Sequence, residues 1–186
     1  MFFKFYFTYI YKKYEICYII SMKIDNEEFM SIISPIITHP EFIKRKEYMH
    51  HENQSVYEHS INVSYIVFKM AKKRKHIDLK SSVIGALLHD FYYKPWQGNK
   101  DHKPLFKKHG FAHAKEALEN SRIYFKEYLN PIVENCILRH MFPLNIHPPK
   151  YKEAWLVTLA DKIDSLKIFK HPKSLPKYLG IKKKKD

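Results

Sequence analysis

The chain has 186 residues, of which 45% are hydrophobic and 28% charged, the balance of a single globular domain with a core of its own. Its formal net charge is +14, but the basic residues are spread along the sequence, so we expect no nucleic-acid partner. The only two cysteines, Cys17 and Cys136, exclude a disulfide-stabilised scaffold and fit a reducing, cytoplasmic location.

The first 21 residues differ from the rest of the chain. They are apolar and aromatic, but charged residues interrupt them, so no stretch reaches the roughly 18 to 20 apolar residues of a membrane span. They also lack a small-residue cleavage site, so we expect neither a signal peptide nor membrane attachment. The sequence becomes ordinary at Met22. We therefore expect residues 1–21 to be a non-native or disordered extension, 22–175 to form the domain, and 176–186 to be a basic disordered tail.

Amphipathic patterns predict about six helices and no convincing strand, which indicates an all-α bundle. In chain order, the first predicted helix follows the start signal Asp25–Glu28 and is limited by Pro35 and Pro40. The second opens at Asn53-Gln54-Ser55, the third runs from Ser81 to His89-Asp90, and the fourth opens at His109-Gly110. The fifth is capped by Asn130-Pro131, and the last runs from about Lys152 to Phe169.

Potential metal ligands interrupt three of these apolar patterns. The run Val83–Leu88 is typical of a core segment, yet it ends in His89-Asp90. Adjacent side chains on a helix point about 100° apart, so the two converge only on an ion in the crevice between them. His59 and Asp161 are polar residues of ligand type within the apolar stretches of two other helices, and they would supply partners.

This ordered set of a His, a His-Asp pair and a later Asp resembles the HD superfamily of metal-dependent phosphohydrolases, of the stand-alone bacterial type. The segments "GALLHD" and "LADKID" are similar to the ligand segments of that family, and the resemblance covers roughly residues 55–170. It implies an HD-like helical bundle in which His59, His89, Asp90 and Asp161 bind a first divalent metal ion. Asp164, three residues after Asp161, is expected behind the ligands or in solvent.

The resemblance also implies a second ion in some branches. His109-Gly110 is similar to a His-Gly that opens a helix in two-metal members, and "RH" at Arg139-His140 is similar to the segment that supplies another ligand. We therefore expect His109 and His140 to hold a second ion, with Asp90 bridging to it. His113 shares a helix face with His109 at i+4 spacing, and we expect it to contact substrate.

The segment after the His-Asp pair departs from the family pattern, because Tyr92 stands where a Gly is usual and Lys94 falls one position later than the usual lysine. We retain Lys94 and Arg139 as candidates to stabilise phosphate charge, alongside Asp90 as a catalytic residue. Tyr93 and Trp96 are expected to stack a substrate base, the alternative being loop packing.

Imidazole and carboxylate ligands without thiolate suit Mn, Fe, Co, Ni or Zn. The expected reaction is attack of a metal-activated water on a phosphate ester or anhydride of a nucleotide-like substrate. The two-metal set is similar to the bacterial branch that cleaves diadenosine tetraphosphate, although other substrates stay open. Two alternatives are an HD-fold di-iron oxygenase and a non-catalytic module that binds nucleotide or RNA. The sequence leaves the oligomeric state undetermined.

Overall fold

The computed structural model describes residues 27–51, 54–93 and 105–170, with the backbone alone for residues 51, 105–112 and 167–170. The predicted N-terminal extension, the predicted basic tail, Lys94 and Trp96 therefore lie outside the described residues. The backbone of His109 is described and its side chain is not.

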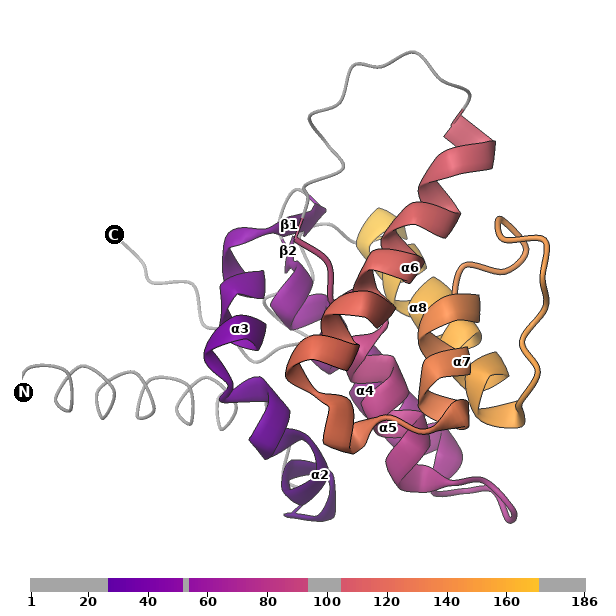
Figure 1. The fold of residues 1–186 in the computed structure, drawn as a ribbon. Helices are drawn as coiled ribbons and strands as arrows, with labels where there is room; N and C mark the ends of the chain where they lie inside the picture. Colours follow the sequence, from indigo (N-terminus) through magenta and orange to yellow (C-terminus); the bar gives the residue numbers. More distant parts are fainter. Residues whose placement is uncertain (1–26, 52–53, 94–104, 171–186) are drawn as a thin grey trace, which may run out of the picture.

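Within the described ranges the chain is almost entirely helical, which confirms the predicted all-α bundle (Figure 1). Its elements are α2 (Glu27–Ile37), α3 (Pro40–Ile43), the 3-10 turn η1 (Lys44–Glu47), β1 (Met49–His51), β2 (Gln54–Ser55), α4 (Val56–Ala71), α5 (Leu79–Leu88), α6 (Leu105–Tyr124), the 3-10 turn η3 (Lys126–Tyr128), α7 (Pro131–Arg139) and α8 (Lys152–Lys170). The small antiparallel hairpin of β1 and β2 was not predicted from the sequence.

Helix α5 is the centre of the bundle. Every residue from Ser81 to Leu88 is buried, and α5 packs against α4, α7 and α8. The approach of α7 is close because Gly85 has no side chain: a Cβ atom there would lie 2.5 Å from Cys136 Cβ. A helix that is apolar on all sides must be surrounded by other helices, and this position brings the residues at its C-terminus into the interior.

Capping residues fix where the helices begin. Ser55 and Glu58 form a capping box at the start of α4, and Asn130 accepts hydrogen bonds from the first N–H groups of α7. Helix α5 begins at Leu79 rather than at Ser81, because the Asp78 carboxylate accepts the Ser81 N–H and acts as the N-cap.

One other predicted boundary was wrong. Helix α6 begins at Leu105, so His109 lies inside it instead of opening it. Helix α2 contains Pro35 and ends at Ile37, before Pro40, the second of the two prolines expected to limit it. A proline inside a helix removes one backbone hydrogen bond. Here Ile36 and Ile37 are both completely buried, and their burial offsets that loss.

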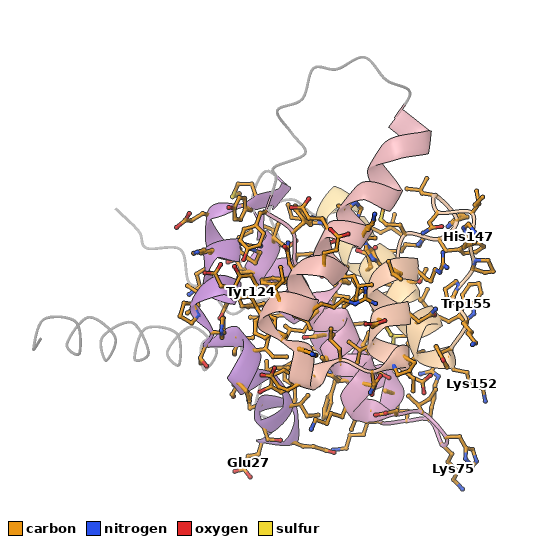
Figure 2. The ribbon with its side chains drawn as sticks, viewed as in Figure 1. Glu27, Lys75, Tyr124, His147, Lys152 and Trp155 are labelled. Carbon is orange, nitrogen blue, oxygen red and sulfur yellow. The ribbon has the colours of Figure 1, made fainter. Side chains whose placement is uncertain are left out.

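The outside of the bundle carries charged side chains such as Glu27 together with exposed apolar ones such as Trp155 (Figure 2). Lys75, His147 and Lys152 all lie at its outer edge in this view, away from the central helix. Cys136 is buried with a free thiol, so it forms no disulfide. In the part of the chain that is described, no helix combines the length and the hydrophobicity that a membrane crossing requires.

Candidate metal centre

His59 lies in the first turns of α4, and its ring is held from behind by α8. The side chain is completely buried, and Nδ1 lies 3.0 Å from Asp164 Oδ2. Since a carboxylate accepts, Nδ1–H is the donor, and Nε2 is the nitrogen whose lone pair an ion would bind once its proton is displaced. Asp164 is held in turn by Gln54 Nε2, which donates to Oδ2 at 3.3 Å. This arrangement fixes both the orientation and the tautomer of the His59 imidazole.

His89 and His140 are each oriented by a hydrogen bond to the end of their own helix, α5 and α7 respectively. Each residue is the C-cap of its helix, and the Nδ1–H of each donates to the carbonyl three residues earlier, at 2.6 Å to Ala86 and 2.7 Å to Ile137. The last carbonyls of a helix lack intrahelical partners, so a histidine at this position satisfies one of them. Both rings thereby turn their Nε2 atoms towards the interior.

The first four predicted ligands come together around one point. His59 Nε2 lies 3.3 Å from His89 Nε2, 3.2 Å from Asp161 Oδ1 and 3.7 Å from Asp90 Oδ2, and His89 Nε2 lies 3.4 Å from the same Asp90 oxygen. Donor atoms on a common ion at about 2.0 to 2.2 Å have separations of this size. We call His59, His89, Asp90 and Asp161 the first cluster.

A second cluster uses the other oxygen of Asp90. Asp90 Oδ1 lies 3.4 Å from His140 Nε2 and 3.6 Å from His113 Nε2, and the two imidazole nitrogens are 3.1 Å apart. His113, which was expected to contact substrate, thus lies among the potential ligands of the second ion, and the side chain of His109, one helical turn earlier on α6, lies outside the described residues. We call Asp90, His113 and His140 the second cluster.

The shifted pKa values in the two clusters indicate that these side chains together favour a bound cation. Burial by itself would lower the pKa of His59, but the Asp161 and Asp164 carboxylates outweigh it and raise that pKa from 6.5 to about 10. Burial would raise the pKa of Asp90, but the neighbouring His89 and His140 hold it well below its usual range. Without an ion, the buried carboxylates therefore draw protons onto the imidazoles, and a divalent ion would replace those protons.

The buried carboxylate of Asp90 provides a direct test of whether a metal fits. Its Oδ1 atom is buried and accepts no hydrogen bond from any described group. An unsatisfied buried carboxylate oxygen is costly, and it faces two imidazoles whose nitrogens suit borderline divalent ions. Three groups of residues meet the spacing required of metal ligands, namely His59–His89–Asp161, His89–Asp90–His140 and His50–His59–Asp90. The residues present therefore fit a divalent metal.

Comparison with known families agrees with this geometry. The family model described as "HD domain" matches residues 56–166, well over half of the chain. The chain belongs to the HD-domain family. HD domains bind divalent metal ions and are generally metal-dependent phosphohydrolases. Neither a curated protein nor a solved structure gives a significant match to the chain.

Of the other candidate site residues of this HD domain, the structure describes the side chains of Tyr93 and Arg139. The Tyr93 hydroxyl donates to Glu41 Oε2 at 2.6 Å, and the Arg45 guanidinium lies 4.1 Å from the centroid of its ring. One face of Tyr93 is thus already covered, which favours the packing alternative over base stacking on that face. Arg139 is partly buried and precedes His140 at the end of α7.

Sequence reasoning missed His50, whose ring contacts the first cluster of the HD domain. The His50 ring stacks on the His59 ring with centroids 3.8 Å apart and planes 18° apart, and His50 Nδ1 lies 3.8 Å from Asp90 Oδ2. The hairpin of β1 and β2 positions it. A polar stretch containing two adjacent histidines gave no periodic signal from which this position could be predicted.

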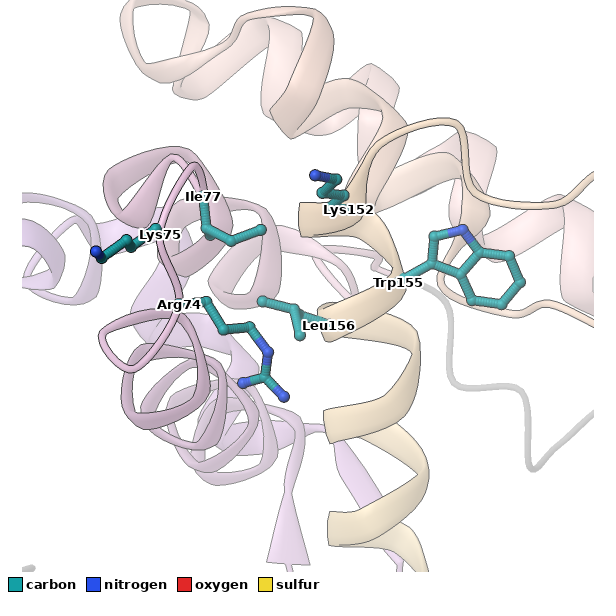
Figure 3. Close-up of a pocket in the computed structure, with 6 residues that line it drawn as sticks. All are labelled: Arg74, Lys75, Ile77, Lys152, Trp155 and Leu156. Carbon is teal, nitrogen blue, oxygen red and sulfur yellow. The ribbon is translucent and has the colours of Figure 1, made fainter.

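A surface pocket of about 440 Å³ lies elsewhere on the HD domain, between the α4–α5 connection and the start of α8 (Figure 3). It is lined by Arg74, Lys75, Ile77, Lys152, Trp155 and Leu156, none of which belongs to either cluster. The Trp155 ring points away from it, and Arg74, which follows α4, donates through Nη1 to the carbonyl of Met70 near the end of that helix. Its polar groups do not converge, so the buried clusters remain the candidate functional site.

Proposed function

We propose that the protein is a metal-dependent phosphohydrolase that cleaves a phosphate ester or anhydride of a nucleotide-like substrate. The observation that carries this proposal is the position of Asp90 between two clusters. Its Oδ2 atom faces His59 and His89, and its Oδ1 atom faces His113 and His140. A carboxylate shared in this way is the arrangement that two-metal hydrolases require.

In this proposal the first cluster holds one ion, and Asp90, His113 and His140 hold the second. His109 stays a candidate for an additional ligand, because it lies one turn before His113 on α6. Imidazole and carboxylate donors accept Mn, Fe, Co, Ni or Zn, so the donor set does not select among these metals. Bound ions would activate a water molecule and hold the phosphoryl oxygens of the substrate.

The protein's own contribution is to hold these side chains in place and to keep part of the site dry. His59, His89 and His140 are almost completely buried, whereas the side chains of Asp161 and His113 are 13% and 24% exposed. The graded exposure supports entry of substrate from the side of these last two residues. Preoriented ligands need little rearrangement when an ion or a substrate binds, which favours catalysis.

Arg139, Lys94 and Trp96 complete the proposal. Arg139 adjoins His140, and its guanidinium would neutralise negative charge that develops on the phosphate. Lys94 is proposed for the same role and Trp96 for base stacking, on the basis of the sequence alone. The nucleotide part of the proposal rests on the family resemblance and on these two residues.

The test is metal content together with hydrolysis. Purified protein loaded with Mn²⁺ or Fe²⁺ is expected to contain two ions per chain, and the double variant His113→Ala/His140→Ala is expected to contain one. Exposed His147, at the outer edge of the molecule, supplies the control variant His147→Ala, which should retain both ions (Figure 2). Dinucleotide polyphosphates and nucleoside monophosphates form the substrate panel.

The same preparations separate this function from the alternatives. Phosphate release by the wild type and its loss in His89→Ala would support hydrolysis. Substrate-dependent oxygen uptake by the iron-loaded protein, without phosphate release, would instead favour an oxygenase. Salt-sensitive RNA binding that survives His89→Ala and Asp90→Ala, with no turnover of any substrate, would favour a binding module.

A further inference from the structure

Helix α8 has two faces of different character. Asp161 and Asp164 lie on its inner face, where the metal centre is. On the opposite side Trp155, Leu159 and Leu166 are 46%, 48% and 58% exposed. At 100° per residue, these three side chains lie within about 40° of one another around the helix axis, so they form a single apolar stripe along the outside of α8.

The loop between α7 and α8 lies against this stripe. The Phe142 ring meets the Trp155 ring edge-on, with centroids 5.3 Å apart and planes 76° apart. Leu144 and Ile146 follow in the same loop, and both are exposed, Ile146 by 76%. We call the stripe and these two loop residues together the apolar face, which consists of Trp155, Leu159, Leu166, Leu144 and Ile146.

The one charged residue between Trp155 and Leu166 that shares their side of α8 is Lys162, and its charge is turned away from solvent. Its Nζ donates to the Phe142 carbonyl at 2.6 Å and to the Thr158 carbonyl at 3.5 Å, and its side chain is partly buried. The stripe therefore presents mainly carbon atoms, although the chain as a whole has a net charge of +14. Such a surface is complemented by another apolar surface rather than by an acidic partner.

The size of the apolar face fits the centre of a protein interface. Single exposed leucines are ordinary, but contiguous apolar patches of about 300 to 600 Å² are the largest on most monomers and are often functional. A standard interface buries about 800 Å² on each partner, with an apolar core inside a polar rim. Five large side chains that are about half exposed or more can form such a core, with the polar residues around them as the rim.

We propose that the apolar face binds the same face of a second copy of the chain, forming a symmetric dimer. A straight stripe is complementary to itself about a two-fold axis perpendicular to the helix. With the two α8 helices antiparallel, Trp155 of one copy meets Leu166 of the other, and the two Leu159 side chains lie near the axis. The large indole thus packs against a smaller side chain. The contact also braces the helix that carries Asp161.

The experiment is sedimentation velocity of the full chain over a range of protein and salt concentrations. Leu159→Arg and Trp155→Arg place a charge in the apolar face, and Ile123→Arg, at a 69% exposed position on α6, is the matched control. We expect the wild type and the control to dimerise equally. Leu159→Arg should weaken dimerisation at least about 30-fold, the effect of losing an interface hot spot. Salt should strengthen the dimer, because it screens the repulsion between two positively charged copies.

A milder substitution separates loss of the contact from misfolding. Leu159→Ala keeps a good helix former, and it should weaken dimerisation in the same direction but by less. Circular dichroism and bound Mn²⁺ should match the wild type in every variant, because the substituted side chains lie away from the metal centre.

Three results would overturn the proposal. A wild type that stays monomeric at the highest concentration would mean that residues outside the described ranges, or a different protein, cover this face. A dimer that survives both arginine substitutions would be formed through another surface. A dimer that salt weakens would be held by opposite charges rather than by the apolar face.

Discussion

The Nδ1 atom of His59 lies 3.0 Å from the Oδ2 atom of Asp164, on the opposite side of the ring from the metal cluster. Asp161, one turn earlier on α8, approaches Nε2 of the same ring at 3.2 Å. One helix thus supplies a carboxylate to each nitrogen of His59. The two carboxylates have different roles, since Asp161 faces the ion site and Asp164 orients the histidine.

Removing Asp164 should therefore weaken metal binding without removing a ligand. We expect Asp164→Ala to lower the affinity for Mn²⁺ about 10- to 100-fold, the usual effect of losing the partner of a metal-binding histidine. Asp164→Asn, which keeps an oxygen that accepts from Nδ1–H, should lose less. Calorimetric titration measures both. Glu134→Ala, which breaks only an exposed pair with Arg122, is the control. Unchanged affinity in Asp164→Ala would contradict the role given to this residue.

Substitution of Asp90 should affect both ions, whereas other ligand substitutions should affect one. We expect Asp90→Ala to lose the first and the second ion together, because each of its oxygens faces a different cluster. Asp161→Ala should weaken mainly the first ion, and His113→Ala mainly the second. Metal analysis after dialysis against a fixed ion concentration distinguishes these patterns. An Asp90→Ala protein that keeps one ion at wild-type affinity would show that the carboxylate does not bridge.

The metal-free protein should lose stability as the pH rises. The pKa of His59 is raised from 6.5 to about 10, so its contribution is complete below pH 6.5 and is lost as the pH rises through 10. The pKa values of Asp90 and Asp161 are lowered from 3.8, so their contributions are present above that pH and are lost in acid. We therefore expect the free energy of unfolding to be greatest between pH 3.8 and 6.5.

Urea unfolding of chelator-treated protein, at pH values below 3.8, between 3.8 and 6.5, and above 6.5, measures this pH dependence. With the metal bound, the free energy of unfolding should instead rise with pH above 6.5, because fewer protons then compete with the ion for the ligands. The variant His59→Gln should flatten the metal-free dependence above pH 6.5. Metal-free stability that increases between pH 6.5 and 9 would contradict the charge arrangement derived for the first cluster.

Gly85 should not tolerate even one additional carbon atom. In an unhindered helix, Gly→Ala stabilises by about 0.5 to 1 kcal/mol. At Gly85 the new Cβ would lie 2.5 Å from Cys136 Cβ and 2.9 Å from Cys136 Sγ. Overpacking of this kind costs about 1 to 3 kcal/mol, so we expect net destabilisation, with weaker metal binding because α5 carries His89 and Asp90.

A double-mutant cycle with Cys136→Gly tests the cause. In that background the two nearest atoms that a Cβ at position 85 would meet are absent, and Val133 Cα, at 3.7 Å, is at an ordinary contact distance, so Gly85→Ala should cost less than it does in the wild type. Thermal unfolding of the four proteins gives the coupling. An equal cost in both backgrounds would mean that the contact between α5 and α7 is not the reason.

The sequence by itself determined the helical class and the ordered set of His59, His89-Asp90 and Asp161. Apolar periodicity reports which face of a helix is buried, and a ligand-type residue on such a face is conspicuous because burying it is costly unless it has partners. The C-terminal position of His89-Asp90 followed from the same reasoning, because the apolar run stops there.

Only the tertiary structure decided between residues on one face of a helix and identified contacts between distant segments. The packing of α6 against α7 brings His113 to His140, a contact between two helices that the spacing of histidines along α6 does not predict. The sequence assigned the ligand role to Asp161 and left Asp164 either behind the ligands or in solvent, and the packing of α8 against α4 places Asp164 against His59 Nδ1. His50 lies in a short hairpin without periodicity. Its position depends on how the chain is folded back onto α4, which local sequence does not encode.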